Sequence, residues 1–350
     1  MRLPFHVLAL ALGAVVSCTS EHQSPTEAPP VKPVGLRTID LALSSATPLF
    51  TSRANAINDS GVVVGWAAVN AADSVRAVVW RPPNYQVEFL PDQNVPGGSN
   101  AIAIGRDGVI GGQIGCGRSG AVSCTPVYWR DGVLHKLDGV GQVNGVCPCD
   151  SHTLVGQVLV NGELHGALWI DDVLIDVGPP GANTQLLSVA HGFIVGNSFS
   201  DTVLSPGTGR GFRWSPASGW TRLVGPPPFG GGYVSDVNSS GTAVGQATVG
   251  TLWLNGSNTG TPIPEEVDEG NGNIGNGGLE TAINDSSVVA GLFTGGGHPF
   301  PVAAIWSQAK GWSIIGGEIN PRVTDINNSN QVVGYWATEG PGFHALLWNP

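Results

Sequence analysis

A run of carboxylates beside flexible residues is the first feature of the sequence that suggests chemistry. The segment EEVDEGNGNIGNGG, residues 265–278, places Glu266, Asp268 and Glu269 among asparagines and glycines. Carboxylate oxygens bind Ca²⁺ and also attract basic partners. The spacing matches no EF-hand or other calcium loop, so we predict no metal site here. A solvated acidic loop is the simpler interpretation.

Four cysteines, Cys116, Cys124, Cys147 and Cys149, lie in the body of the chain. In an exported protein an even number favours disulfides, and four cysteines allow three connectivities. Cys116 and Cys124 flank one loop, and we favour that pair. The CPC stretch with His152 nearby offers too few ligands, at the wrong spacing, for a zinc site. Cys147 and Cys149 are expected to form a local disulfide or to stay free thiols.

Two tryptophans and two aspartates complete the set of candidate binding residues. Trp66 and Trp336 each follow a glycine-terminated apolar run, where their rings either stack on sugars or pack under loops. Asp236 and Asp325 occupy equivalent positions in two copies of a repeat. A pair of acids facing one cavity is the arrangement that glycoside hydrolysis needs.

Recognised catalytic motifs do not occur in the sequence. It contains no nucleophile elbow, no HExxH pair and no phosphate-binding glycine loop. We therefore predict no catalytic residue and no cofactor, and we favour a protein that is not an enzyme.

The elements that must position these residues are short β-strands. Glycine accounts for 52 of 350 residues and proline for 26, charged residues make up 12%, and the chain has 11 tryptophans. This composition is typical of a β-rich fold with many turns. The net charge of −11 disfavours nucleic acid as a partner, because binding it needs clustered Lys and Arg.

Two anchor residues alternate seven times along the chain. A glycine ends one apolar run, and a tryptophan ends the next. The glycines are Gly65, Gly112, Gly156, Gly196, Gly245, Gly291 and Gly334. The tryptophans are Trp80, Trp129, Trp169, Trp214, Trp253, Trp306 and Trp348. Seven units of roughly 45 residues indicate a repeat architecture.

Each unit divides into four strands joined by turns such as NDSG, NSSG and NNSN. Four strands per unit predict an all-β fold, a seven-bladed β-propeller. The last unit ends at LLWNP without a fourth strand, while GLRTIDL, residues 35–41, resembles one. We predict that this N-terminal strand completes the last blade and closes the ring.

The connections on the two faces of the predicted ring differ in length. First-to-second and third-to-fourth turns are short and uniform. The connections on the other face are long and irregular, at residues 67–75, 114–125, 197–211, 226–233 and 267–279. Irregular loops on a rigid scaffold are where binding usually occurs, so we expect ligands on that face.

The repeat resembles the HAF-type extracellular repeats of bacterial secreted proteins. The matching stretches include AINDSGVVVG, DVNSSGTAVG, AINDSSVVAG, DINNSNQVVG and HALLW, and the resemblance covers about residues 34–350. It implies an exported propeller without a catalytic motif. Unit three departs from the pattern with CPCDSH in place of the turn, and unit four with a shortened VAHG.

The N-terminus is similar to a lipoprotein signal peptide. Arg2 precedes a short apolar run, which ends in VVSC at Cys18. The resemblance implies that residues 1–17 are cleaved and that Cys18 is acylated. Residues 18–33 are polar and proline-rich, as in an extended tether. Thr19 follows the cysteine, and the resemblance to enterobacterial lipoprotein sorting implies the outer membrane.

These features predict a monomeric, lipid-anchored propeller at the outer membrane or cell surface of a bacterium. The membrane is contacted through the lipid alone, and a glycan or an envelope protein is the expected partner. Two alternatives stay open, a propeller hydrolase or lyase acting on polysaccharide and a purely structural envelope protein.

Overall fold

The computed structural model describes residues 37–43, 49–71, 74–116, 124–150, 152–178, 183–199, 210–228, 230–247, 249–264, 266–267, 274–295, 298–318, 321–337 and 342–349. Every regular element in these ranges is a β-strand. Among the described residues, no helical segment has the length and hydropathy needed to span a membrane. Residues 1–17, Cys18 and the tether lie outside the described residues.

Seven antiparallel sheets follow one another along the unit Gly35–Pro350, and we number them blades 1 to 7. Blade 1 consists of β2 (Thr51–Ile57), β3 (Val63–Ala68), β4 (Arg76–Trp80) and β5 (Val87–Phe89). Blade 2 consists of β6 (Ser99–Ile104), β7 (Ile110–Ile114), β8 (Thr125–Arg130) and β9 (Val133–Lys136). Blade 3 consists of β10 (Gly141–Val146), β11 (Thr153–Val160), β12 (Glu163–Ile170) and β13 (Val173–Asp176). Blade 4 consists of β14 (Asn183–Ala190), β15 (Phe193–Phe199), β16 (Arg210–Ser215) and β17 (Gly219–Arg222).

The remaining three blades include the closure of the ring. Blade 5 consists of β18 (Tyr233–Val237), β19 (Ala243–Gln246), β20 (Gly250–Trp253) and β21 (Thr261–Pro262). Blade 6 consists of β23 (Ile274–Ile283), β24 (Val289–Gly295), β25 (His298–Ser307) and β26 (Gly311–Ile314), with the short β22 (Glu266–Val267) paired to β23 as a fifth strand. Blade 7 consists of β27 (Arg322–Ile326), β28 (Val332–Ala337), β29 (Phe343–Asn349) and β1 (Arg37–Asp40).

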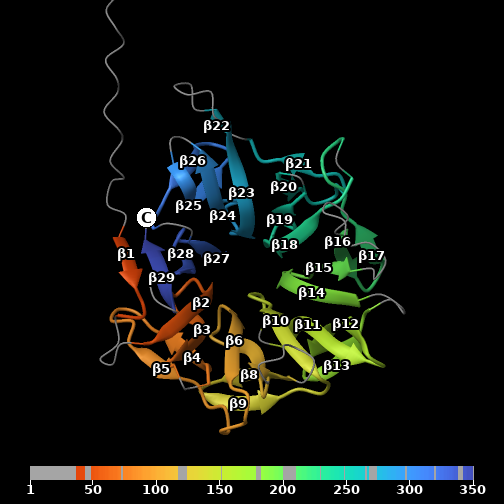
Figure 1. The fold of residues 1–350 in the computed structure, drawn as a ribbon. Helices are drawn as coiled ribbons and strands as arrows, with labels where there is room; N and C mark the ends of the chain where they lie inside the picture. The colour runs from red at the N-terminus through yellow and green to blue at the C-terminus, as the bar shows by residue number, and fades with distance from the viewer. Residues whose placement is uncertain are drawn as a thin grey trace, which may run out of the picture. The chain divides into compact units, whose positions relative to one another are not determined.

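The blades form a ring in which the first strand of each is innermost (Figure 1). The predicted seven-bladed propeller with four strands per blade is therefore confirmed. The closure is confirmed as well, because β1 pairs with β29, with Thr38 opposite Trp348 and Asp40 opposite Leu346. His344 Nδ1 lies 2.8 Å from Asp40 Oδ2 and links the two ends of the chain further.

A β-bulge interrupts the first strand of every blade at the equivalent place. In blade 1, Ala54 pairs with Gly65 and Ala56 pairs with Val64, so Asn55 is the extra residue. A Cβ on Gly65 would overlap the carbonyl of Arg53 on the bulged strand. The repeat glycines Gly112, Gly156, Gly196, Gly245 and Gly334 meet the same obstacle. The bulge thus explains why the second strand requires glycine here.

The apolar core is divided among the junctions between neighbouring blades. Seven clusters of buried residues each combine side chains of two adjacent blades. Six clusters contain one repeat tryptophan each, and the partly buried Trp214 packs against the seventh. Trp80, Trp129, Trp169, Trp253 and Trp348 are fully buried. A single blade cannot bury both of its faces, so each tryptophan fills the space between two blades.

Candidate functional site

A polar cavity of about 330 Å³ occupies the centre of the ring. The first strands of all seven blades line it, and the turns between first and second strands bound one end. We call these seven turns the channel mouth. Their leading residues, in blade order, are Asn58, Gly105, Cys147, Ala190, Asn238, Asn284 and Asn327. This end is opposite to the face of long loops that we expected to bind ligands.

Asp236 and Asp325 both line the cavity, directly after the bulges of blades 5 and 7. Each carboxylate bridges to the next blade. Asp236 Oδ2 accepts a hydrogen bond from the main-chain N–H of Ile283 at 2.9 Å, and Asp325 Oδ2 accepts one from Ile57 at 2.8 Å. Asp236 Oδ1 also accepts a bond from Ser188 Oγ in blade 4 at 2.6 Å. Both acids therefore hold neighbouring blades together.

The channel shifts the protonation of these two acids. Burial raises the pKa of Asp236, although hydrogen bonds from Ser188 and Ile283 act in the opposite direction. Burial, together with the negative charge of Asp236, raises the pKa of Asp325 to about 8. Both residues line the cavity and are half-buried. The raised pKa favours the protonated form of Asp325 at neutral pH, in which its carboxyl group can donate a proton.

Asparagines lead four consecutive turns of the mouth, those of blades 5, 6, 7 and 1. In blade 7, Asn327 Oδ1 accepts hydrogen bonds from the N–H groups of Ser329 and Gln331 at 3.0 and 2.9 Å. Its Nδ2 donates to the carbonyl of Asn58 in blade 1 at 3.0 Å. The same donor link runs from Asn238 to Asn284, from Asn284 to Asn327 and from Asn58 to Gly105, at 3.0, 3.0 and 3.3 Å. We call these four turns the asparagine side of the mouth.

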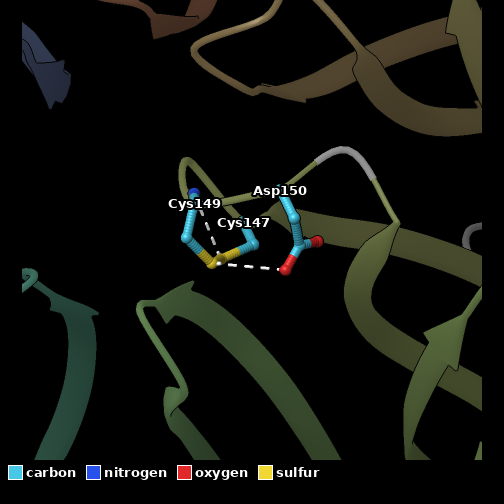
Figure 2. A group of neighbouring side chains, drawn as sticks. All are labelled: Cys147, Cys149 and Asp150. Carbon is cyan, nitrogen blue, oxygen red and sulfur yellow. Dashed lines mark hydrogen bonds between the residues drawn. A yellow bond between two sulfur atoms is a disulfide. The ribbon is translucent and has the colours of Figure 1, made fainter.

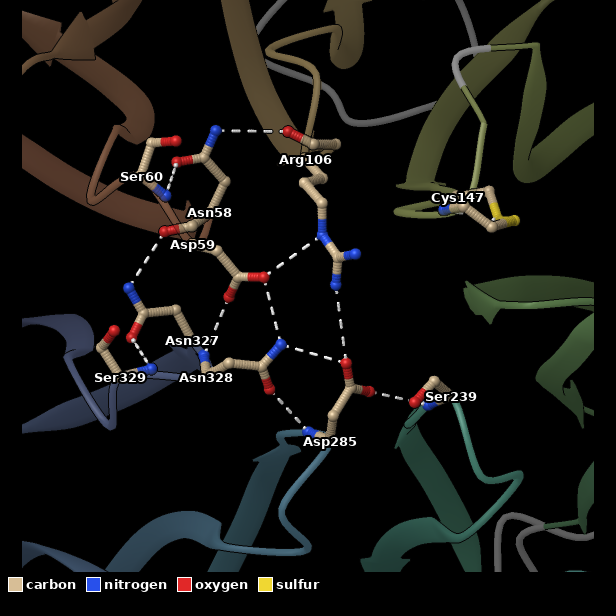
Figure 3. A network of polar contacts seen from close by, with 12 residues as sticks. Asn58, Asp59, Ser60, Arg106, Cys147, Ser239, Asp285, Asn327, Asn328 and Ser329 are labelled. Atoms are coloured by element: carbon tan, nitrogen blue, oxygen red, sulfur yellow. Dashed lines mark hydrogen bonds and ion pairs between the residues drawn. A yellow bond between two sulfur atoms is a disulfide. The ribbon is translucent and has the colours of Figure 1, made fainter.

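A second tier of polar contacts covers the asparagine side (Figure 3). Asn328 Nδ2 donates to Asp59 Oδ2 at 3.1 Å and to Asp285 Oδ2 at 3.0 Å. The N–H of Ser239 donates to Asp285 Oδ1 at 2.9 Å. Arg106 reaches in from blade 2, with Nε 3.3 Å from Asp59 Oδ2 and Nη2 3.7 Å from Asp285 Oδ2. This guanidinium thus joins the turns of blades 1 and 6 to that of blade 2.

The environment of Asp285 favours its ionised form. Burial alone would raise its pKa, but hydrogen bonds from Ser239 and Asn328, with the charge of Arg106, hold that pKa below its ordinary value. The mouth therefore carries an ionised carboxylate at its rim, whereas Asp325 deeper in the channel is protonated.

The turns of blades 2, 3 and 4 lack the asparagine. Gly105, Cys147 and Ala190 take its place, and Arg106, Pro148 and His191 follow them. A second hollow, of about 510 Å³, opens over these turns and is lined by Arg106, Asp107, Pro148, Cys149, Asp150, His152 and His191. We call these three turns the cysteine–histidine side of the mouth.

Both cysteine pairs form disulfides. Cys116 is bonded to Cys124, which confirms the pairing that we favoured, and Cys147 is bonded to Cys149. Ligand atoms of Cys147, Cys149 and Asp150 lie within 4.8 Å of one another (Figure 2). With both sulfurs in a disulfide, this group has no thiolate to offer a metal.

Trp66 and Trp336 lie in β3 and β28, and both are half-buried. The guanidinium of Arg53 lies 5.1 Å from the centre of the Trp66 ring and also contacts Tyr335 and Phe343. Trp336 packs against the core between blades 6 and 7. Each ring therefore has protein contacts on at least part of its surface, as in the packing interpretation.

Several predicted features fall outside the described residues. Asp268 and Glu269 lie there, and of Glu266 only the backbone, in β22, is described. The long connections at 67–75, 114–125, 197–211, 226–233 and 267–279 are each described only in part. Binding by that face therefore stays a prediction.

Sequence reasoning missed Asp59, Arg106 and Asp285 as members of the mouth. For Asp59 and Asp285 the available signal was their position directly after the repeat asparagine, because that residue is charged or polar in all four asparagine-led turns. Arg106 follows Gly105 and lacks this signal. The sequence shows the departures CPCDSH and VAHG, but not that both lie on one side of the mouth.

Comparisons with known proteins support the fold. Similar solved structures include the β-propeller domain of the Trilobed protease from Pyrococcus furiosus, with 12% identity over 85% of this chain and 95% of that chain and a TM-score of 0.56. Streptogramin B lyase matches with 10% identity over 90% of this chain and 97% of that chain, at a TM-score of 0.53. The uncomplexed acylaminoacyl peptidase of Pyrococcus horikoshii matches with 10% identity over 87% of this chain and 52% of that chain, at 0.56.

No protein-family model matches the chain, and no curated protein is similar to it in sequence. At identities this low, the structural likeness concerns the architecture alone. The chain is a seven-bladed β-propeller closed by its N-terminal strand.

Proposed function

We propose that this chain is an exported, lipid-anchored binding module that captures a polar ligand at the cysteine–histidine side of the channel mouth. The observation that supports this most is the hollow of about 510 Å³ over the turns of blades 2 to 4. It adjoins the central cavity through residues common to both, Arg106 and Pro148. Loops positioned by a rigid scaffold often carry binding residues, and ligands usually bind in concave sites.

The lining of the hollow indicates the chemistry of its ligand. Arg106, His152 and His191 offer donors, whereas Asp107 and Asp150 offer acceptors. A ligand rich in hydroxyl and amide groups, such as a glycan or a peptide segment of an envelope protein, satisfies both kinds. The lipobox at Cys18 would keep the module near such ligands.

Capture from the native envelope tests this proposal. We expect His191→Asn, which tolerates the positive φ of 47° at this position, to reduce glycan-array signal or partner recovery at least about fivefold. Ser240→Ala, an exposed change on the asparagine side, is the matched control and should bind as the wild type does. If His191→Asn binds normally and removal of residues 200–209 abolishes capture, the binding face is that of the long loops.

Membrane attachment is tested separately. Cys18→Ala should move the protein from the membrane fraction to the soluble fraction, with loss of acyl mass. A wild-type protein without acyl mass would exclude the lipid anchor.

A polysaccharide-cleaving enzyme is the second candidate, and the pKa of about 8 for Asp325 beside Asp236 favours it. Asp325 would protonate the leaving oxygen, and Asp236 would serve as the base. The hydrogen bonds that both acids accept from neighbouring blades favour a structural role instead. Loss of polysaccharide cleavage in Asp325→Asn, with an unchanged melting temperature, would support the enzyme.

A further inference from the structure

The two disulfides of the molecule differ in what they can contribute to folding. Cys116–Cys124 spans eight residues of sequence, whereas Cys147–Cys149 spans two. In the chain-entropy account, a disulfide stabilises the fold by restricting the unfolded chain, and the effect shrinks as the closed loop shortens. A disulfide between residues two positions apart restricts the unfolded chain very little, so Cys147–Cys149 is expected to contribute little to the free energy of unfolding.

The two sulfurs of this short disulfide are unequal in exposure. Cys147 directly follows β10, the first strand of blade 3, and is 1% exposed. Cys149 is exposed and lines the hollow of the cysteine–histidine side beside His152 and His191. An incoming thiolate can therefore reach only the Cys149 sulfur along the axis of the bond.

The local structure is prepared to stabilise the sulfur that would leave. The main-chain N–H of Cys149 points to Cys147 Sγ at 3.3 Å, so a thiolate released at Cys147 would receive a hydrogen bond at once. Asp150 holds the turn in this shape, since its Oδ1 accepts bonds from the N–H groups of His152 and Thr153 at 3.0 and 2.7 Å. The Asp150 carboxylate also lies 3.5 Å from Cys149 Sγ, where its charge disfavours a thiolate. Attack at Cys149 with departure of Cys147 is thus the preferred direction.

The disulfide turn of blade 3 can be compared with the asparagine turn of blade 1. Asn58 Oδ1 accepts a bond from the N–H of Ser60, two residues on, just as Cys147 Sγ accepts one from Cys149. The disulfide therefore occupies the place of the asparagine cap. It does not reproduce the asparagine's donor link to the next blade, so its reduction would leave the inter-blade hydrogen bonds of the asparagine side unchanged.

We propose that Cys147–Cys149 is a thiol–disulfide exchange site that oxidises a dithiol reaching the channel mouth. A thiolate of that dithiol attacks Cys149 Sγ, which forms a mixed disulfide and releases Cys147 as a thiolate. The second thiolate of the dithiol then attacks the dithiol's first sulfur, which is bonded to Cys149 in the mixed disulfide, and Cys149 leaves as a thiolate. Two electrons pass to the protein, the two cysteines take up two protons, and the dithiol becomes a disulfide.

Graded reduction of the purified full chain tests the proposal. The chain is equilibrated with dithiothreitol in a chelator, which keeps metal off the thiols, then alkylated and mapped by mass spectrometry. We expect Cys147–Cys149 to open at a dithiothreitol concentration at least about tenfold below that for Cys116–Cys124, with one dithiothreitol oxidised per chain. Reduction of the two pairs in parallel, or of Cys116–Cys124 first, would overturn the proposal.

Trapping the mixed disulfide tests which sulfur is attacked. When the oxidised chain reacts with reduced glutathione and is quenched with acid, peptide mapping should find glutathione on Cys149 at least about tenfold more often than on Cys147. Equal labelling, or more glutathione on Cys147, would refute the assigned direction. Cys116→Ser with Cys124→Ser is the matched control and should leave the reduction of Cys147–Cys149 unchanged.

The exchange site does not depend on the ligand-binding proposal. Dithiothreitol is small and needs no recognition, so a failure of capture leaves this measurement intact. Conversely, the Cys147→Ser and Cys149→Ser double variant should lose dithiol oxidation, whatever its effect on capture.

Discussion

The two sides of the channel mouth are made from the same turn of the repeat, yet they contain different chemistry. On the asparagine side, each leading asparagine caps its own turn and donates to the next one, from Asn238 through Asn284 and Asn327 to Asn58. On the cysteine–histidine side, Gly105, Cys147 and Ala190 make no such chain of donors. The hollow with the exposed disulfide lies on that side.

The difference indicates how a repeat protein can combine rigidity with a site. A turn that must match its neighbours on both sides is restricted to a few residue types, because its polar groups are buried and need partners. The turns of blades 2, 3 and 4 do not make these links between blades, so their leading residues are not restricted to asparagine. Arg106 then connects the two sides through Asp59 and Asp285.

The largest expected effect concerns the core, where the two sides should not differ. Trp169→Ala, between blades 2 and 3, and Trp348→Ala, between blades 6 and 7, should each cost about 3–5 kcal/mol, because both side chains are fully buried. Trp66→Ala, at a half-buried ring, is the control and should cost less. Chemical denaturation measures all three. If Trp169→Ala lowers the free energy of unfolding much less than Trp348→Ala does, then the cores beneath the two sides also differ.

The asparagine chain should matter more than its cysteine counterpart. Asn327→Ala removes two turn caps and one donor to blade 1, for an expected loss of about 2–4 kcal/mol. The double variant Cys147→Ser and Cys149→Ser, at the equivalent turn, should cost less than about 1 kcal/mol. Denaturant titration under matched conditions compares them. Equal losses would mean that the disulfide is as structural as the asparagine.

The channel acids should make stability depend on pH. The pKa of Asp325 is raised to about 8 in the folded protein, so the fold binds this proton more tightly than the unfolded chain does. The stabilisation is fully present below about pH 4 and is lost as pH rises to about 8, for a total on the order of 2–5 kcal/mol. Asp325→Asn should flatten this slope in urea titrations between those pH values, whatever its effect on absolute stability. If the free energy of unfolding of Asp325→Asn falls as steeply with pH as that of the wild type, groups other than Asp325 cause the pH dependence.

The smallest effect tests the link between the two sides. Arg106→Ala should cost less than about 1 kcal/mol, because its ion pairs are partly exposed, and the cost should vanish in 1 M salt. The same change should raise the pKa of Asp285, whose stabilising contribution is lost as pH falls through that pKa. Carboxyl NMR titration follows this shift. Arg81→Ala, which breaks the exposed pair with Glu88, is the control and should leave Asp285 unchanged.

Much of the architecture could be predicted because it is local. The alternation of glycine and tryptophan marks the strands, and the missing fourth strand beside Trp348 predicts the closure by residues 35–41. Asp236 and Asp325 could be assigned to the channel because equivalent positions in a repeat share one environment. Their role in joining blades could not be predicted, because the N–H groups that donate hydrogen bonds to them belong to Ile283 and Ile57, on other blades.

By itself, the sequence determined the period, the number of blades, the position of the tryptophans and the strand that closes the ring, because each depends on spacing within one unit or on what a unit lacks. Only the tertiary structure decided that Asp59, Arg106 and Asp285 meet and that Cys149 faces a hollow with His152 and His191. The bulge in each first strand was also invisible in the spacing, although it explains the repeat glycine. The physical reason is that closing the ring brings seven turns, each separated by a whole blade of sequence, to a single mouth, where one blade's donors meet another blade's acceptors.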